Sequence, residues 1–159
     1  MIIKELRDED FTNYKKPSMV IGFPTCSWKC ENDCGRRGLC QNSSLALAPN
    51  IDIKVIDLIY RYIGNPITKA VVCAGLEPFD SWDSLQCFIL NFRYYSDDDI
   101  VIYTGYTKEE IGREKLDWLS SYGTIVIKFG RFVPDQEPHY DDVLGIKLAS
   151  DNQYAEVIS

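Results

Sequence analysis

The chain has 159 residues, of which 45% are hydrophobic and 26% are charged, a composition typical of a globular protein with one domain over residues 1–159. Its formal net charge of −7 excludes an extended basic surface of the kind that neutralises nucleic-acid phosphates. No apolar run is long enough to cross a bilayer, and the charged N-terminus lacks the apolar core of a secretory leader. We therefore expect a cytoplasmic protein that binds neither nucleic acid nor membrane.

The first half of the chain predicts strands that alternate with helices. A short β-rich run at residues 19–23 leads directly into a cysteine-rich loop. Apolar residues recur at helical spacing over residues 52–64, and a Gly-Asn-Pro tripeptide ends that helix. A compact apolar strand at residues 70–73 is followed by a turn and then by a second helix over residues 81–95.

The second half continues the alternation. Residues 100–103 form the next predicted strand, and Thr107 and Glu110 have the spacing of a capping box that opens a helix. Gly112 lowers helix stability by roughly 1 kcal/mol relative to alanine, so we expect this helix to break there. A further strand is predicted at residues 125–129 and a loop at residues 134–138.

This order of elements predicts an α/β fold with mostly parallel strands and right-handed crossovers. In such sheets, ligands and catalytic groups gather at the carboxyl ends of the strands. The cysteine loop, residues 75–78 and residues 104–106 each follow a predicted strand. We therefore expect these three segments to lie at the same edge of the sheet.

Four cysteines fall within fifteen residues, at Cys26, Cys30, Cys34 and Cys40. Closely spaced thiolates repel one another unless a cation or a cluster takes up their charge, and cytoplasmic thiols stay reduced. The spacing therefore indicates a metal centre, most simply an iron–sulfur cluster. The two remaining cysteines stand alone in apolar stretches and are predicted to be buried small hydrophobic residues, Cys73 and Cys87.

Four short segments carry the most specific pattern in the sequence. They are Cys40-Gln41-Asn42 at the end of the cysteine loop, Ala74-Gly75-Leu76-Glu77-Pro78 after a strand, Tyr103-Thr104-Gly105-Tyr106-Thr107 before a helix, and Ser150-Asp151-Asn152-Gln153 near the end of the chain. In this order and spacing they resemble the radical S-adenosylmethionine proteins, specifically the activating component of anaerobic (class III) ribonucleotide reductase. That family has Cys-His-Asn, Gly-Gly-Glu-Pro and Ser-Ser-Asn-Gln at the first, second and last segments.

The resemblance implies an oxidoreductase with a partial (β/α) barrel of radical S-adenosylmethionine type. A [4Fe-4S] cluster held by three cysteines would leave one iron free to bind S-adenosylmethionine. Reductive cleavage of this ligand would give a 5′-deoxyadenosyl radical that abstracts hydrogen from a glycine of the partner, the large subunit of anaerobic ribonucleotide reductase. Reduced flavodoxin or ferredoxin would supply the electron.

The resemblance also assigns site residues. Glu77 and Pro78 lie where the family receives the methionine ammonium, and a carboxylate suits a cation. Gly75 lets the backbone approach a ligand closely. The full set of expected cofactor-binding residues is Leu39, Gly75, Glu77, Pro78, Thr104 and Gly105. Asn152 and Gln153 are instead expected to be a satisfied polar strand edge.

The family's usual motif is Cys-x3-Cys-x2-Cys, and this chain departs from it. The ligands could be Cys26, Cys30 and Cys34, or Cys26, Cys30 and Cys40. We favour the second set, because the apolar Leu39 before Cys40 suits a contact with the adenine and Gln41-Asn42 after it matches the family's His-Asn. Residues 31–38 would then bulge and carry Cys34 outward.

Other functions are also consistent with the sequence. All four loop cysteines could bind zinc in a non-catalytic interaction module, although zinc ligands usually come as two close pairs. The chain could also activate a different glycyl-radical partner. His139, the only histidine, is expected to be a surface residue in a loop. Because 159 residues can form only part of a barrel, we expect the partner's glycine loop to enter its open side, opposite the cysteine loop.

Overall fold

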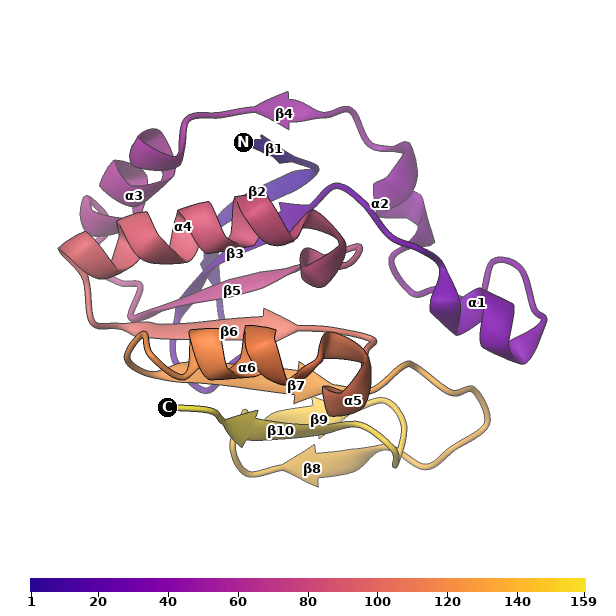
Figure 1. Ribbon diagram of the computed structural model, residues 1–159. Helices are drawn as coiled ribbons and strands as arrows, with labels where there is room; N and C mark the ends of the chain where they lie inside the picture. Colours follow the sequence, from indigo (N-terminus) through magenta and orange to yellow (C-terminus); the bar gives the residue numbers. More distant parts are fainter.

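The computed structural model describes residues 1–159 and has an α/β architecture around one mostly parallel sheet (Figure 1). The sheet has six strands in the order β10-β7-β6-β5-β3-β2. The four inner strands run parallel to one another, and they are β3 (Ser18–Phe23), β5 (Ala70–Gly75), β6 (Asp99–Tyr103) and β7 (Ile125–Phe129). This confirms the α/β architecture with mostly parallel strands and all four strands predicted from the sequence, whereas the expected partial barrel is not shown.

Both edges of the sheet are antiparallel. β2 (Glu5–Asp10) pairs with β3, and β10 (Tyr154–Val157) pairs with β7. The two edge strands do not pair with each other, so the sheet is open and no barrel is closed. Two further strand pairs flank it, namely β1 (Ile2–Ile3) with β4 (Ile51–Asp52) and β8 (His139–Asp141) with β9 (Ile146–Leu148). The sequence analysis did not predict these short strands or the two edge strands.

Four helices cover one face of the sheet (Figure 1). They are α3 (Val55–Ile63), α4 (Trp82–Tyr95), α5 (Lys108–Ile111) and α6 (Arg113–Leu119). Three short helices lie in the connections that follow β3 and β5, namely α1 (Lys29–Cys34), α2 (Ser43–Leu47) and the 3-10 helix η1 (Pro78–Ser81). No helix combines the length and the apolar character that a membrane span requires.

The predicted break at Gly112 is confirmed. α5 ends at Ile111 and α6 begins at Arg113, while Gly112 between them has a φ of 83° that a helix cannot contain. The capping box is also present: the Thr107 side chain accepts from the Glu110 backbone, and the Glu110 side chain accepts from the Thr107 backbone. Local sequence therefore fixed both ends of α5.

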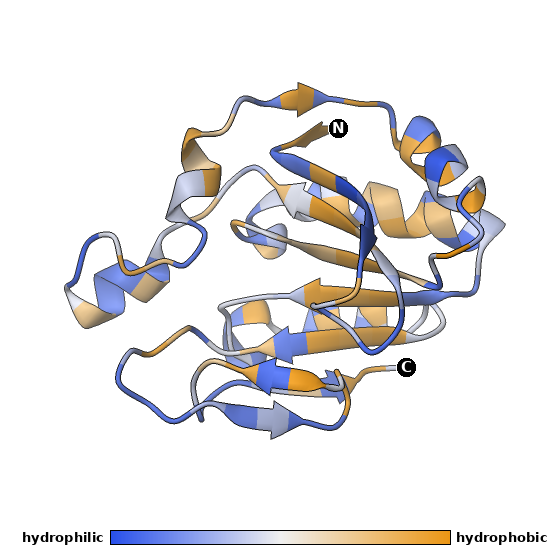
Figure 2. Cartoon of the chain, turned by 180° about the vertical axis from the view of Figure 1, so that it is seen from behind, coloured by the Kyte–Doolittle hydropathy of each residue, from blue (hydrophilic) through white to orange (hydrophobic).

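Alternate residues of each inner strand face opposite sides of the sheet. In β7, Ile127 packs with the helices, whereas Val126 belongs to a second cluster on the other face. That second face is covered by Tyr14, Leu144 and Leu148, which come from the β2–β3 connection and the β8–β9 hairpin. Figure 2 shows this face from behind, with the mostly hydrophilic β2 along one side.

Two single-residue expectations are wrong and one is confirmed. Cys73 is buried in β5, as expected, but Cys87 is exposed. Cys87 lies on the outer side of α4, because the helical repeat turns Leu85 and Phe88 inward. His139 begins strand β8 rather than lying in a loop, and its Nδ1 atom is buried without a hydrogen-bond partner.

The end of β5 makes a testable demand on Gly75. Its φ is 95°, and a Cβ there would lie 2.6 Å from the backbone nitrogen of Phe23. Gly35 also has a positive φ, 64°, but a Cβ there would meet nothing within 4 Å. Replacing Gly35 with alanine should therefore cost about 1 kcal/mol of unfolding free energy from backbone strain alone. Gly75→Ala should cost at least about 2 kcal/mol more, because it also forces β3 and β5 apart.

Urea unfolding of the two variants beside the unmodified protein measures this difference. Equal losses in the two variants would show that the close approach of β3 and β5 at Gly75 has no energetic weight.

Candidate functional site

The segments that follow β3, β5 and β6 meet at the carboxyl edge of the sheet, as the sequence analysis predicted. The backbone of Leu76 donates to Phe23, and that of Glu77 donates to Thr25 at 2.8 Å. These bonds extend the β3–β5 pairing beyond the sheet and into the two loops. The cysteine loop therefore leaves the sheet directly beside the turn that carries Glu77.

Glu77 is the centre of this edge. Its side chain is only 3% exposed, yet it is hydrogen-bonded on both oxygens. Oε1 accepts from the backbone of Phe79 at 3.1 Å and from the Thr104 hydroxyl at 2.8 Å, while Oε2 accepts from the backbone of Gly105 at 2.9 Å. Three of the expected site residues, Glu77, Thr104 and Gly105, are thus in direct contact.

Local sequence explains how Glu77 reaches this position. It is the N-cap residue of η1, and Pro78 occupies the first helical position, where its missing N–H has no cost. Burial raises the pKa of the Glu77 carboxyl to about 7, against the hydrogen bonds from Gly105, Thr104 and Phe79 that favour its charged form. Pro78 is buried beneath the turn and supports Glu77 without lining a cavity.

Cys30 stands between two adjoining cavities. The larger one has a volume of about 360 Å³ and is lined by Cys30 and Cys40, and the smaller one is lined by Cys26 and Cys30. Both cavities also border Gly105, where a Cβ would lie 3.4 Å from the Cys30 sulfur. The absence of a side chain at Gly105 thus leaves room beside this thiol.

The fourth loop thiol points away. Cys34 is exposed, borders neither cavity, and donates to the Cys30 carbonyl at 3.0 Å. This placement agrees with the expected outward position of Cys34. No three Cys, His, Asp or Glu side chains are grouped closely enough to hold a single metal ion, and this applies to Cys26, Cys30 and Cys40 as well as to the four cysteines of the zinc alternative.

Two thiols of the site, Cys26 and Cys30, have raised pKa values that favour their protonated form. Burial raises the pKa of Cys26 to about 11, and the nearby Glu77 carboxyl adds to the effect. Burial also raises the pKa of Cys30, followed by the influence of Cys40, while Arg131 opposes both. Thiolates form at these positions when a cation arrives to replace the protons.

The Cys40 end of the loop is fastened to the sheet edge. Asn42 donates from its side chain to the Gly75 carbonyl at 2.9 Å. The Glu31 carboxylate accepts from the backbones of Gly38 at 3.0 Å and Cys40 at 3.3 Å. The segment that resembles Cys-His-Asn therefore contacts the segment that resembles Gly-Gly-Glu-Pro. Leu39, the expected adenine contact, is half-buried and lines neither cavity.

Helix α1, between these two ends, is attached mainly by charged side chains. It contains no buried residue. Lys29 lies 3.4 Å from Glu110, and Asp33 lies 2.9 Å from Arg131, which also pairs with Glu110 at 2.5 Å. Exposed ion pairs contribute about 1 kcal/mol or less each, and Arg131, 14% exposed, is the least exposed member of these pairs. The segment that carries Cys30 is therefore weakly attached compared with either end of its loop.

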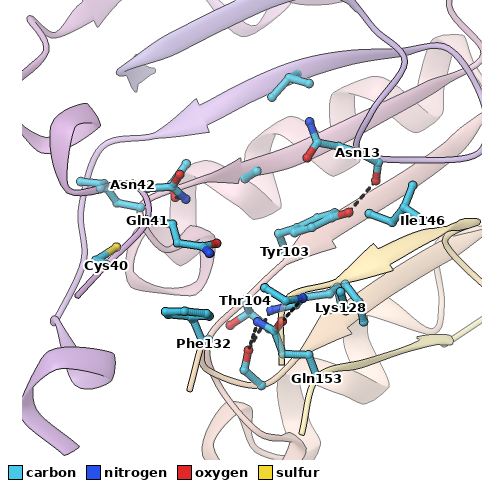
Figure 3. A pocket seen from close by; sticks show the side chains of 18 of the residues that line it. Asn13, Cys40, Gln41, Asn42, Tyr103, Thr104, Lys128, Phe132, Ile146 and Gln153 are labelled. Atoms are coloured by element: carbon cyan, nitrogen blue, oxygen red, sulfur yellow. Dashed lines mark hydrogen bonds between the residues drawn. The ribbon is translucent and has the colours of Figure 1, made fainter. Parts of the chain in front are cut away.

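Lys128 is the main site residue that the sequence analysis missed. It is 7% exposed and lines the larger cavity (Figure 3). Its ammonium donates to the Gly130 carbonyl at 2.8 Å, its only hydrogen bond, so two of its three N–H groups have no protein acceptor. Burial lowers the pKa of Lys128 to about 8. The signal was a single lysine inside the otherwise apolar strand Ile-Val-Ile-Lys-Phe.

The C-terminal segment closes this cavity. Gln153 is buried, donates to the Gly130 carbonyl at 3.3 Å and accepts from the backbones of Ala149 and Ser150. Asn152 donates to the Arg131 carbonyl at 2.9 Å. Both side chains satisfy backbone groups, as expected. Gln153 also lines the larger cavity, together with Lys128.

The raised pKa of Glu77 predicts a pH dependence of stability. Its folded-state value of about 7 lies above the ordinary 4.5, so the folded protein keeps a proton that the unfolded chain has released. The resulting stabilisation is fully present below about pH 4.5 and is lost as the pH rises through 7, by up to about 3 kcal/mol. Glu77→Gln should abolish this loss, as measured by urea unfolding across that range.

The matched control is Glu114→Gln, which removes an exposed carboxyl on α6. It should keep the pH dependence of the unmodified protein. A Glu77→Gln variant that also keeps it would show that Glu77 titrates normally in the folded state.

The motifs behind the sequence resemblance thus converge at one edge of the sheet, through the Asn42–Gly75 and Glu77–Thr104 hydrogen bonds. Both of the larger cavity's thiols come from the same loop. In the comparisons with known proteins, no family model, no curated protein and no solved structure matches this chain.

Proposed function

We propose that the chain is a radical S-adenosylmethionine activase whose partner is the glycyl-radical subunit of an anaerobic ribonucleotide reductase. The observation that carries the proposal is a buried carboxyl group and a buried ammonium group placed beside the same thiol. Glu77 follows β5, Lys128 is the penultimate residue of β7, and each lines a cavity that also contains Cys30. If an α-amino-acid group binds a metal beside Cys30, its ammonium needs a negatively charged partner and its carboxylate needs a positively charged one.

Both side chains have the capacity to receive such a group. Oε2 of Glu77 accepts only the Gly105 amide, so it can accept one more donor, such as an ammonium. Lys128 has two N–H groups for a carboxylate. The cavity of about 360 Å³ lies within the range of sites for small molecules. Its polar and aromatic lining includes Asn13, Tyr103 and Phe132, which can position the rest of the ligand.

Cys26, Cys30 and Cys40 would hold the cluster. In a four-iron cluster each thiolate binds a different iron, so its ligands spread more widely than the four around one zinc ion at about 2.3 Å. Two cavities that share Cys30 suit that wider spread. Three protein ligands leave one iron open, and the bound cluster supplies the electron that cleaves the sulfonium of S-adenosylmethionine. Reduced flavodoxin or ferredoxin is the proposed source of that electron.

The winding of the sheet supports a partial barrel of the radical S-adenosylmethionine type. The parallel strands are adjacent in chain order, and the crossover helices α3, α4, α5 and α6 all cover one face. A doubly wound sheet reverses its strand order and places helices on both faces. The larger cavity opens on the helix-free face between β2 and β9, where Arg7 and Lys147 line it. A glycine-bearing loop of the partner would enter there.

The choice of ligands is tested by replacing Cys34 and Cys40 separately with alanine. After anaerobic reconstitution, Cys34→Ala should retain the iron and the cleavage of S-adenosylmethionine under a strong reductant, because this thiol faces away from both cavities. Cys40→Ala should lose both. The opposite result would make Cys34 the ligand. A colourless wild-type protein with zinc and no iron would establish the zinc module and refute the proposed activity.

The role of Lys128 predicts a selective binding defect. Lys128→Met should weaken binding of S-adenosylmethionine at least about tenfold, because a charge-assisted hydrogen bond is lost. An analogue without the carboxylate should bind the variant and the unmodified protein equally. Calorimetric titration of the reconstituted protein measures the affinity for both ligands. The control is Lys69→Met, which replaces an exposed lysine just before β5. A similar loss for both ligands would mean that Lys128 only shapes the cavity.

A further inference from the structure

The first residues of the cysteine loop are held by a carboxylate that no motif in the sequence marked. Asp80, in η1, accepts from the backbone amide of Ser27 at 2.6 Å through Oδ2. Its other oxygen accepts from the phenol of Tyr106. One side chain thus ties the segment after β3 to the segment after β6.

Neighbouring contacts complete this anchor. The hydroxyls of Ser27 and Tyr106 lie 2.8 Å apart. Ser27, Tyr106 and Asp80 therefore form a closed triangle in which each residue is hydrogen-bonded to the other two. The Lys29 ammonium lies 4.5 Å from the centre of the Tyr106 ring. Thr25 and Ser81 hydroxyls bond at 2.7 Å on the other side. Both residues flank the anchor, one before Cys26 and one after Asp80.

The anchor acts directly on Cys26. The residue after Cys26 is Ser27, whose backbone amide donates a hydrogen bond to Asp80. Trp28 has a left-handed φ of 57°, a conformation that costs a non-glycine residue energy, and its amide donates to the Cys26 sulfur at 3.2 Å. A residue stays in this conformation only when its surroundings hold it there. The bonds to Ser27 are the nearest such restraint.

We propose that Asp80 is the positioning residue of Cys26. It fixes the first arm of the cysteine loop, residues 24–28 between β3 and α1, to the sheet edge through Ser27 and Tyr106. The second arm has its own restraint, the Asn42–Gly75 bond. Helix α1 between them is the adjustable part, since it contains no buried residue and is attached mainly by ion pairs. The assignment of Cys26 as a cluster ligand rests on the proposed function, whereas the anchoring itself is a property of the chain alone.

The test uses the full chain without iron and compares Asp80→Ala, Asp80→Asn and Asp83→Ala. Asp83 is an exposed carboxylate one residue into α4, without hydrogen bonds, and serves as the matched control. Hydrogen exchange of the Ser27 amide, followed by NMR, should accelerate about tenfold or more in Asp80→Ala, because a hydrogen bond to a charged group is lost. Asp80→Asn removes the same charge but keeps an acceptor, so it should restore most of the protection.

A second measurement follows the thiols. Iodoacetamide alkylation mapped by mass spectrometry should speed up at Cys26 in Asp80→Ala, relative to Asp80→Asn, which carries the same net charge. Cys40, on the other arm, and the buried Cys73 should be unchanged. Tyr106→Phe, which keeps the ring beneath Lys29, should show a smaller increase in exchange at Ser27 and provides the test if Asp80→Ala fails to fold.

Two results would overturn the proposal: unchanged Ser27 exchange in Asp80→Ala, or equal behaviour of the Asn and Ala variants. A parallel rise in Cys73 alkylation would reveal general unfolding of Asp80→Ala, and unchanged Ser27 exchange in Tyr106→Phe would then overturn the proposal. Iron content after anaerobic reconstitution adds the functional arm, and a drop in folded Asp80→Ala supports the role toward the cluster. A wild-type protein that binds no iron defeats the proposed function, while the exchange and alkylation data still decide the role of Asp80.

Discussion

The buried carboxylate of Glu77 is the constraint on which the site depends. Desolvation opposes its charge, and the amides and hydroxyl of the flanking loops offset that cost only partly, which leaves its pKa near 7. In return, Glu77 ties the end of β5 to the first residues after β6, Thr104 and Gly105. These bonds place the two loops side by side next to Cys30, where Glu77 and Gly105 line the smaller cavity.

Lys128 has a comparable desolvation cost, because its ammonium is buried. A buried ammonium with one protein acceptor does not stabilise the fold by itself, which supports the binding role that we propose for it. Together with Glu77 it sets the electrostatic character of the site: opposite charges in separate cavities around one thiol. This pattern suits a zwitterionic ligand better than a ligand of either single charge.

Around these fixed groups the cysteine loop combines firm and loose attachments. Asp80 holds its first arm and Asn42 holds its second, while the Lys29–Glu110 and Asp33–Arg131 pairs hold α1 between them. A loop of this kind can adjust the Cys30 thiol without moving the two arms. Such adjustment is what a protein needs if its thiols must close around a cluster that arrives after folding.

The sequence by itself determined the inner strands, the helices that cover the sheet, the break at Gly112 and the meeting of three loops, because hydrophobic period, capping and glycine act over a few residues. It also indicated that Cys34 stands apart. Only the tertiary structure decided four other features: the open edges of the sheet, the exposure of Cys87, the burial of Lys128, and the contact of Asp80 with Ser27. Those features depend on which segments pack together over long separations, and a pattern confined to neighbouring residues does not contain that information.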